Sequence, residues 1–589
     1  MVQLRHRLLH SMVVMKFGQF IKNYFPECTL STQQNIVLST KLGFEAKNEL
    51  NNILSWPPNV FMIVYSLLEY TDKYRLMVSP QSHFTWDYQK DNKTVQFITA
   101  EWLALISIQS GQQGNSTISS FINLEYSLGK VFSSQNFDID IYDLMNTSEF
   151  ATCAMYLLLS VDELFSDVDI CDYKLENRLQ LLLLMRNSYF PSQRKNLADN
   201  DCKLGFVTYK TSVPQTGLTL NNLTHSLTCI KPSVLPEVVA NKHLKQGYNK
   251  KSYNILFLPW PFTIESDAFK PTTNQIKMDG YFGSFDYLPD DKYEPSKFLQ
   301  AILATLRRCG TIDLIVFPEC ALSDKTFNKY MITLHRLFDG NAPSILSGIF
   351  GNVGSISTNK AKLSFIGELG IDTIEQSKHH RWFLDETQVR NYNLASSLDL
   401  GRKWWENIAI DRRHLVTLHT ANGVKLCPLI CEDLARQEPV AQAVRSVGPN
   451  LVVSLLLDGP QLDFRWPGKY SAVLSDDPGS SVLSVTAPGM TQRATGLGHP
   501  PSRQVALWSE PGGSAETLKI DEDGLGIVIE LEVKDEPMWT IDGRKKVKPV
   551  LRKKKHTTVL PRDANIINTS VLSLQTELRK IIKKSGGIK

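Results

Sequence analysis

Short, almost continuously apolar runs alternate with stretches of helical spacing in the second half of this chain, and this alternation restricts the fold most. The first such runs are NILFLPWPF, DLIVFPECALS and SILSGIFGN, with helix-like stretches at 296–308 and 325–338 between them. The pattern continues with HLVTLHT, KLCPLICEDLA, NLVVSLLL and SVLSVTA. Buried strands alternating with amphipathic helices are typical of layered domains. We therefore predict an α/β fold for this half.

The first half of the chain has a different pattern of apolar residues. Segments such as NVFMIVYSLLEYTDKYRLMV and FATCAMYLLLSVDELF carry apolar residues at helical spacing, and the texture changes near Lys245 to Ser252. At 589 residues the chain exceeds what one hydrophobic core supports. We predict a mainly α-helical N-terminal domain of unknown role at 1–248, the α/β domain at 249–535, and a basic C-terminal tail with a short helix at 536–589.

Cysteine usage and hydropathy indicate the compartment. The nine cysteines are scattered and form no CxxC pair, which favours free thiols in a reducing compartment. The opening MVQLRHRLLHSMVVMKF mixes charges into its apolar runs and is a poor match to a signal peptide. The longest apolar runs fall short of the ~20 residues that span a bilayer. We expect a cytoplasmic protein without a membrane partner.

The segment KLCPLICEDLAR contains the strongest candidate nucleophile. Its apolar run ends at Cys431, which Glu432 and Asp433 follow at once. A cysteine where a buried strand turns into a helix exposes its sulfur at the edge of the sheet, and we expect the helix N-terminus to favour the thiolate. Cys427 lies inside the strand and is assigned to the core. Taken alone, Cys431 fits a buried structural thiol equally well.

Two further segments carry groups that suit acid–base chemistry. DLIVFPECALS places Glu319 at a strand end, where a carboxylate costs free energy unless it is paired or exposed. Cys320 is a rival nucleophile, but its side chain should point away from that of Glu319. EQSKHHRWFLDETQVRNYNL places Lys378 at a loop or strand end, where an isolated lysine is usually a surface residue.

In this order the three segments resemble the nitrilase superfamily of carbon–nitrogen hydrolases. FPE at 317–319 looks like the glutamate motif of that family, Lys378 matches its lysine, and CED at 431–433 looks like its nucleophile elbow. The resemblance covers roughly Tyr253 to Val533. It implies a nitrilase-type αββα sandwich with Glu319, Lys378 and Cys431 as the catalytic triad. The KHHRW context and the long gap between Lys378 and Cys431 depart from the family pattern.

The resemblance also implies a reaction. Glu319 would take the proton from Cys431, and Lys378 with backbone N–H groups near Glu432 would stabilise the oxyanion. Glu386 and Glu432 are the candidate substrate-binding residues, Glu386 by similarity to an extra glutamate that positions substrate in some members. The expected substrate is a small-molecule amide rather than a nitrile, and no metal or organic cofactor is expected.

Four tryptophans and two arginines are candidates for a substrate pocket. Arg381 and Arg465 would contact an acidic group on the substrate, while the aromatic side chains fit the hydrophobic core better than a pocket wall. The tryptophans are Trp382, Trp404, Trp405 and Trp466.

A second interpretation concerns biological role. RWFLDETQVRNYNL, KWWENIAI and DDPGSSVLSVTAPGM look like a subgroup of large bacterial nitrilase-like proteins with a helical N-terminal region. Some relatives in that subgroup are joined to reverse transcriptases in phage defence, although this chain carries no reverse-transcriptase motif. The alternative function is therefore an effector or binding protein of antiviral defence, with a nitrilase-type fold, whose helical half senses a partner or nucleic acid.

The basic tail leaves two interpretations open. RKKVKPVLRKKK at Arg544 to Lys555 could neutralise the phosphates of a nucleic acid. Alternatively, the tail covers the hydrolase core or an interface in a homo-oligomer. The second interpretation is favoured because Val571, Leu574, Leu578 and Ile581 recur at helical spacing and would otherwise expose an apolar stripe.

Overall fold

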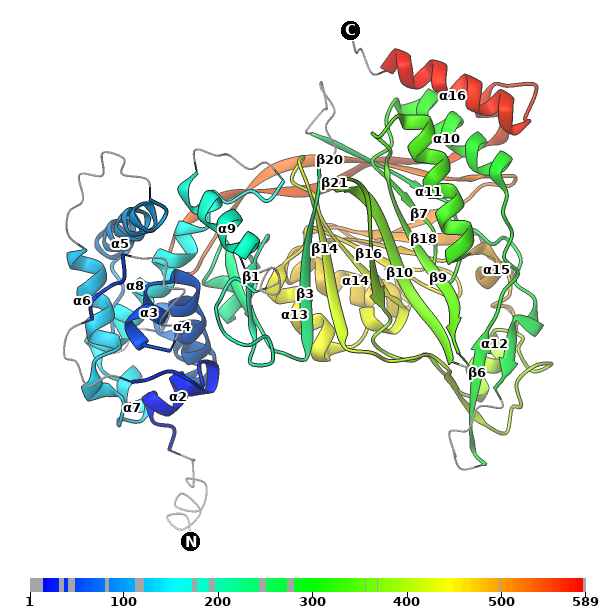
Figure 1. Ribbon diagram of the computed structural model, residues 1–589. Coiled ribbons are helices and arrows are strands. Elements are labelled where there is room, and N and C mark those ends of the chain that lie inside the picture. The colour runs from blue at the N-terminus through cyan, green and yellow to red at the C-terminus, as the bar shows by residue number, and fades with distance from the viewer. Residues whose placement is uncertain are drawn as a thin grey trace. The chain divides into compact units, whose positions relative to one another are not determined.

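The computed structural model describes residues 14–30, 36–40, 48–79, 84–111, 121–171, 177–189, 196–242, 251–272, 280–354, 356–367, 369–496, 498 and 500–585 (Figure 1). The chain divides into two compact units. The first comprises Met1–Val213, Gly217–Pro232 and Met538–Lys546, and the second Pro214–Thr216, Ser233–Pro537 and Val547–Lys589. The domain boundary predicted at residue 248 lies outside the described residues. Across the described ranges, no helix combines the length and apolar character needed to cross a membrane.

The first unit consists mainly of helices. They are α2 (Phe17–Tyr24), α3 (Leu50–Leu54), α4 (Pro57–Thr71), α5 (Tyr88–Gln109), α6 (Ile122–Val131), α7 (Ile141–Met145), α8 (Ser148–Leu164) and α9 (Arg178–Tyr189). Prolines at the first two positions of α4 suit a helix start, where backbone N–H groups lack helical partners anyway. The antiparallel strands β1 (Phe206–Tyr209) and β2 (Leu227–Ile230) complete the unit.

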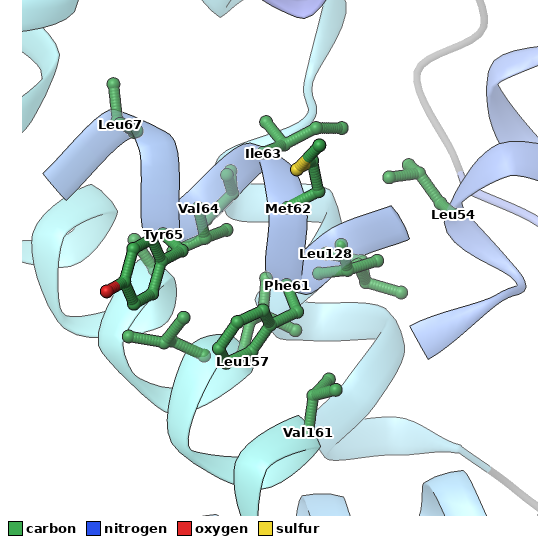
Figure 2. Close-up of a cluster of buried hydrophobic side chains, with 14 of the residues drawn as sticks. Leu54, Phe61, Met62, Ile63, Val64, Tyr65, Leu67, Leu128, Leu157 and Val161 are labelled. Atoms are coloured by element: carbon green, nitrogen blue, oxygen red, sulfur yellow. The ribbon is translucent and has the colours of Figure 1, made fainter. Parts of the chain in front are cut away.

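Helices α4 and α8 form the centre of this unit. Both are apolar around most of their circumference, and nearly every residue of α4 is buried. Figure 2 shows Phe61 and Tyr65 of α4 among buried side chains that include Leu128 of α6 and Leu157 of α8. A helix that is hydrophobic on all sides needs neighbours on all sides, which the other helices provide.

A buried ion-pair network ties the segment Met538–Lys546 into the first unit. Arg544 lies 3.0 Å from Asp162 and 2.7 Å from Asp542, and all three side chains are buried. Asp162 also accepts backbone hydrogen bonds from the N–H groups of His225, Ser226 and Leu227. A buried carboxylate therefore has both a counter-ion and several donors, which offset its loss of hydration.

Two large sheets form the framework of the second unit. The eight-stranded sheet has the order β11-β10-β9-β7-β4-β20-β21, with β8 paired to β9, and the seven-stranded sheet has the order β19-β18-β17-β16-β15-β14-β3. The strands of the first are β4 (Ser252–Phe257), β7 (Leu314–Val316), β8 (Leu322–Ser323), β9 (Ser344–Val353), β10 (Ile356–Gly367), β11 (Gly370–Ser377), β20 (Gly526–Trp539) and β21 (Lys545–Val559). Those of the second are β3 (Val234–Asn241), β14 (Arg413–Thr420), β15 (Lys425–Ile430), β16 (Leu451–Leu455), β17 (Ser481–Val485), β18 (Gln504–Ser509) and β19 (Glu516–Lys519).

A smaller sheet and several helices complete this unit. The four-stranded sheet has the order β12-β13-β6-β5. Its strands are β5 (Phe269–Pro271), β6 (Phe282–Tyr287), β12 (Phe383–Leu384) and β13 (Lys403–Glu406). The helices are α10 (Pro295–Cys309), α11 (Asp324–Phe338), α12 (Glu386–Asn391), α13 (Gln442–Val447), α14 (Trp466–Asp476), α15 (Pro488–Thr491) and α16 (Val571–Ser585).

Successive side chains along a strand point to opposite faces of its sheet, so each large sheet packs against the other sheet on one face and against helices on the other face. The second unit therefore has four layers. Ile255 and Phe257 of β4 join one buried cluster with residues of β15, β16 and β17, so this cluster fills the space between the two sheets. Leu256 faces the other way and packs with α10, α11 and α16. On the far side of the second sheet, Ser471 of α14 contacts Ser484 of β17 at 3.0 Å. The mixed α/β class predicted for this half is confirmed.

The segment predicted as a basic tail contains the long strand β21 and the helix α16. Glutamates of neighbouring strands neutralise part of its charge: Arg552 pairs with Glu536 at 2.9 Å, and Lys555 pairs with Glu530 at 3.2 Å. Leu574 and Leu578 of α16 are fully buried in the cluster formed with α10 and α11. The apolar stripe of this helix therefore covers the core of the second unit, as the second interpretation expected.

Candidate active site

Cys431 lies at the turn that follows β15. This strand is parallel to its neighbour β16, so both carboxyl ends reach the same edge of the sheet. The residue adopts a left-handed backbone conformation with φ of 46°, and a short 3-10 turn runs from Cys431 to Leu434. Positive φ is uncommon for a side chain of this kind, and such conformations cluster at functional sites.

The thiol of Cys431 is buried, and its surroundings disfavour the thiolate. Burial raises its pKa well above the ordinary value, the charges of Glu319, Glu432 and Asp458 act in the same direction, and Lys378 opposes them. The expectation that a helix N-terminus favours the thiolate is therefore wrong. A 3-10 turn of four residues replaces the expected helix, and the surrounding carboxylates outweigh one lysine. Such a thiol needs a base before it can act as a nucleophile.

Glu319 follows β7 and is almost completely buried, with 1% of its surface exposed. Gly348 of β9 allows the chain around Glu319 to approach, because a Cβ at Gly348 would lie 2.4 Å from the Cα of Glu319. The neighbouring Cys320 belongs to a different hydrophobic cluster from that of Cys431, together with Phe285 and Trp382. The two cysteines therefore pack in different hydrophobic clusters, although the charges of Glu319 and Lys378 act on the pKa of both.

Lys378 comes directly after β11 and lies between two carboxylates. Its Nζ donates to Oε1 of Glu319 at 2.8 Å and to Oε2 of Glu406 at 2.7 Å, and its side chain is 1% exposed. An ammonium group has three donors, so these contacts leave one N–H for a further acceptor. The structure thus brings Lys378 and Glu319 into contact.

The two glutamates differ in how many hydrogen bonds they accept. Asn359 of β10 donates to Oε1 of Glu319 at 2.7 Å and to Oε1 of Glu406 at 2.8 Å. Oε2 of Glu406 also accepts from the backbone N–H of Trp382 at 2.9 Å, so both of its oxygens are occupied. Oε2 of Glu319 is buried and contacts no donor among the described residues. Glu319 therefore retains a free oxygen, and Glu406 does not.

The electrostatics of this cluster follow from its burial. Burial raises the pKa of Glu319; Lys378 opposes this shift, while the charge of Glu406 adds to it. Burial acts to lower the pKa of Lys378, but the charges of Glu319 and Glu406 hold it well above the ordinary value. Lys378 therefore remains an ammonium ion, while Glu319 binds a proton more readily than an exposed glutamate.

Glu406 and Asn359 are not among the site residues that the sequence predicts. Glu406 lies in the KWWENIAI segment, and it shares the buried face of β13 with Trp404. Asn359 shares the buried face of β10 with Ala361. A polar residue at an inward position of a strand was the available signal.

Asp433 connects the cysteine turn to the residues that follow Lys378. Its two carboxylate oxygens accept from the backbone N–H of His379 at 3.1 and 3.0 Å, and Nδ1 of His380 lies 2.9 Å from Oδ1. The Asp433 side chain is fully buried. This contact fixes the lysine-bearing loop against the turn that begins at Cys431.

The two predicted substrate-binding residues form ion pairs outside the hydrogen bonds that join Lys378, Glu319 and Glu406. Glu386 starts α12 with 58% of its side chain exposed, and it pairs with Arg390 at 2.8 Å. Glu432 pairs with Arg436, and its charge acts on Cys431. Of the arginines expected to contact an acidic group, Arg381 donates to the carbonyl of Ile408, and Arg465 pairs with Asp458.

No protein-family model matches this chain, and no curated protein sequence does. Solved structures that resemble part of it include an amidase from Nesterenkonia sp., with 11% identity, 50% of this chain and 95% of that chain covered, and a TM-score of 0.30. A CN-hydrolase superfamily protein from Xanthomonas campestris, with an arsenic adduct in its active site, has 13% identity, 48% and 91% coverage, and a TM-score of 0.28. Saccharomyces cerevisiae Nit3, a member of branch 10 of the nitrilase superfamily, has 12% identity, 54% and 92% coverage, and a TM-score of 0.27.

Proposed function

We propose that this protein hydrolyses a carbon–nitrogen bond of a small amide through a thioester on Cys431. One observation carries the proposal. Oε2 of Glu319 is a buried carboxylate oxygen with no donor among the described residues, while Oε1 is held by Lys378 and Asn359. A thiol whose pKa is raised needs such a base, and Glu319 is one of the charges acting on Cys431.

In the first half of the reaction, Oε2 of Glu319 takes the Sγ proton of Cys431, and the thiolate attacks the carbonyl carbon of the amide. The carbonyl oxygen becomes an oxyanion, which the remaining N–H of Lys378 stabilises together with backbone N–H groups near Glu432. The C–N bond then breaks, and the proton on Glu319 passes to the leaving nitrogen. The products of this half are the free amine or ammonia and a thioester on Cys431.

In the second half, water replaces the amine. Glu319 takes a proton from the water, and the hydroxide adds to the thioester carbonyl. The second oxyanion collapses, the C–S bond breaks, and the proton returns from Glu319 to sulfur as the carboxylic acid leaves. Glu406 touches no reacting atom in this scheme. It acts as a positioning residue that holds the ammonium of Lys378 between two carboxylates.

The proposal is tested by trapping and by turnover. Iodoacetamide followed by peptide mass spectrometry should label Cys431 in the folded protein, and Glu319→Gln should slow the labelling because the base is lost. With a panel of simple amides, Cys431→Ala should abolish release of ammonia. The acyl group should appear on Cys431 when the reaction is quenched with acid.

Cys320→Ala is the matched control, because Cys320 is equally buried and lies next to the base. It should leave the acyl adduct and the turnover in place. An adduct on Cys320, or turnover that survives Cys431→Ala, would overturn the assignment of the nucleophile.

A further inference from the structure

Asp458 is a second buried carboxylate at the edge of the sheet that holds Cys431. It follows β16, three residues beyond Leu455, and the register pairs Leu455 with Ile430, the residue before Cys431. Carboxyl ends of neighbouring parallel strands meet at one edge, so both side chains belong to the same region. The charge of Asp458 acts on the pKa of Cys431, which agrees with this placement.

Four hydrogen bonds fix Asp458 in place. Its backbone N–H donates to Oγ1 of Thr486 at 3.2 Å, and the same hydroxyl donates back to the Asp458 carbonyl at 2.7 Å. On the side chain, Oδ1 accepts from the hydroxyl of Tyr392 and from Nη2 of Arg465 at 3.1 Å. Arg465 is itself held by the carbonyl of Pro460 at 2.6 Å. The carboxylate is therefore oriented before any ligand arrives.

The second oxygen of this carboxylate is unused. The Asp458 side chain is 4% exposed, and within the described part of the chain Oδ2 contacts no hydrogen-bond donor. Leaving a buried acceptor unpaired costs about 1–3 kcal/mol, and more for a charged group. A carboxylate that is rigidly held with one oxygen free is built to accept a hydrogen bond from a ligand.

The charge balance determines what kind of ligand fits. Arg465 is already paired with Asp458, so it does not offer an unpaired positive charge to an acidic substrate group, contrary to the expectation from sequence. Nearer the nucleophile, two buried glutamates surround the single ammonium of Lys378. The site therefore carries an excess of acceptors and negative charge, which favours a ligand with a cationic N–H donor.

We propose that Oδ2 of Asp458 binds an amino group on the acyl side of the substrate, so that the enzyme acts on amides of amino acids or of other amino-bearing acyl groups. The inference rests on the proposed function, because it places the ammonium group of the substrate relative to the carbonyl that Cys431 attacks. Asp458 is then a specificity-determining residue.

Binding to Cys431→Ala protein tests the inference without requiring turnover. The probes are glycinamide, 3-aminopropanamide, 4-aminobutanamide and 5-aminopentanamide, each compared by calorimetry with the alkyl amide of equal length. At least one amino amide should bind roughly tenfold or more tightly than its alkyl match, as expected for a hydrogen bond to a charged group. If no amino amide is preferred, the inference is overturned.

Asp458→Asn in the same background is the decisive variant. Its amide oxygen can still accept from Tyr392 and Arg465, while an N–H₂ group replaces Oδ2, so the preference for the amino amide should disappear. Tyr392→Phe is the matched control, because it removes a partner of Oδ1 only and should retain the preference. Equal preference in the Asp458→Asn protein would overturn the role of Asp458.

The proposed function and this inference fail in different ways. Turnover by the chain with Cys431 intact decides the first, and amine preference in the Cys431→Ala background decides the second. If amino and alkyl amides are hydrolysed with equal kcat/KM, the proposed hydrolase function stands, and the proposed binding of an amino group by Asp458 is wrong.

Discussion

At the scale of single residues, unequal hydrogen bonding separates the roles of two buried glutamates. Glu406 accepts from Lys378, Asn359 and a backbone N–H, and both of its oxygens are occupied. Glu319 shares two of these donors but keeps Oε2 free. A saturated carboxylate positions its neighbours, whereas a carboxylate with a free oxygen can exchange a proton. Pairs of acids in different environments commonly divide the work of catalysis in this way.

Glu406→Gln tests this division. The charge of Glu406 raises the pKa of Glu319, so its removal should lower that pKa. Because Glu319 must be deprotonated to act as a base, the acidic limb of the kcat/KM profile should move to lower pH. The plateau should fall by about 10-fold, since the contact of Lys378 with a carboxylate becomes a weaker one with a neutral amide oxygen. A pH profile of kcat/KM measures both effects.

Glu375→Gln is the control for that experiment. Glu375 is an exposed glutamate of β11 that pairs with Lys360 and Lys362 and contacts neither Glu319 nor Lys378. Its pH profile should match that of the unmodified protein. An unshifted acidic limb in Glu406→Gln would mean that Glu406 does not act on the catalytic base.

Some residues of this cluster can be predicted from the sequence and others cannot, for a physical reason. Glu319 and Cys431 end apolar runs, and a polar group at a strand end is visible in one segment. Asn359 and Glu406 lie within strands of two different sheets, and their contacts with Glu319 and with each other depend on how those sheets meet. Glu386 was chosen by similarity of position, and it lies on the exposed start of α12 with Arg390 as its partner.

At the scale of elements, α16 behaves as part of the core. Leu574 is fully buried against α10 and α11, while Leu572 on the opposite face is 75% exposed. Leu574→Ala should lower the free energy of unfolding by about 2–5 kcal/mol. Leu572→Ala removes the same atoms from a solvated position and should change it by less than about 0.5 kcal/mol. Chemical denaturation of the two variants gives the comparison, and equal effects would show that this helix does not cover the core.

The segment Met538–Lys546 contributes a pH-dependent anchor to the first unit. Burial acts to raise the pKa of Asp162, but the charges of Arg544 and His225 and the backbone donors lower it to about 2. A depressed pKa stabilises the folded state above the ordinary value of 3.8, and this stability is lost as pH falls towards 2. The contribution is about 2 kcal/mol at neutral pH.

Substitution of Asp162 makes this anchor measurable. Asp162→Ala leaves Arg544 with a weaker set of partners and should destabilise the first unit by about 3–5 kcal/mol. Asp162→Asn should flatten the loss of stability between pH 4 and pH 2 that the unmodified protein shows. Glu163→Gln is the control, because Glu163 also contacts Arg544 but is partly exposed. A similar loss of stability in Glu163→Gln would mean that the effect comes from removing any negative charge near Arg544, and not from the buried carboxylate of Asp162.

The type of an element, helix or strand, was easier to predict than the strands with which it pairs. The seven apolar runs of the sequence coincide with β4, β7, β9, β14, β15, β16 and β17, because a continuous apolar run is local information, whereas the more polar strands β10, β11 and β18 to β21 gave no such signal. The composition of RKKVKPVLRKKK predicts a basic tail that could bind nucleic acid. Its residues form β21, and glutamates of β19 and β20 pair with several of its charges. Most of this pairing depends on the register of β20 against β21, which local composition does not contain.

At the scale of the whole molecule, the chain passes more than once between its two units. The first unit receives Met538–Lys546 from a hairpin whose strands lie mostly in the second. The second unit takes β3 from the region predicted to be helical, and β3 pairs with β14 from Arg413↔Val234 to Thr420↔Asn241. Cutting the chain at one position therefore does not separate the units cleanly.

Two truncated chains test this organisation. One begins at Ser233 and replaces Met538–Lys546 with an Asn-Gly turn, which suits a two-residue hairpin connection. The other carries the same turn but begins at residue 249 and lacks β3. The first should unfold cooperatively and keep the reactivity of Cys431 towards iodoacetamide. The second should melt at a lower temperature and aggregate, because β14 becomes an unpaired edge strand. Equal melting temperatures would mean that the second unit does not need β3, and that its boundary lies near residue 248.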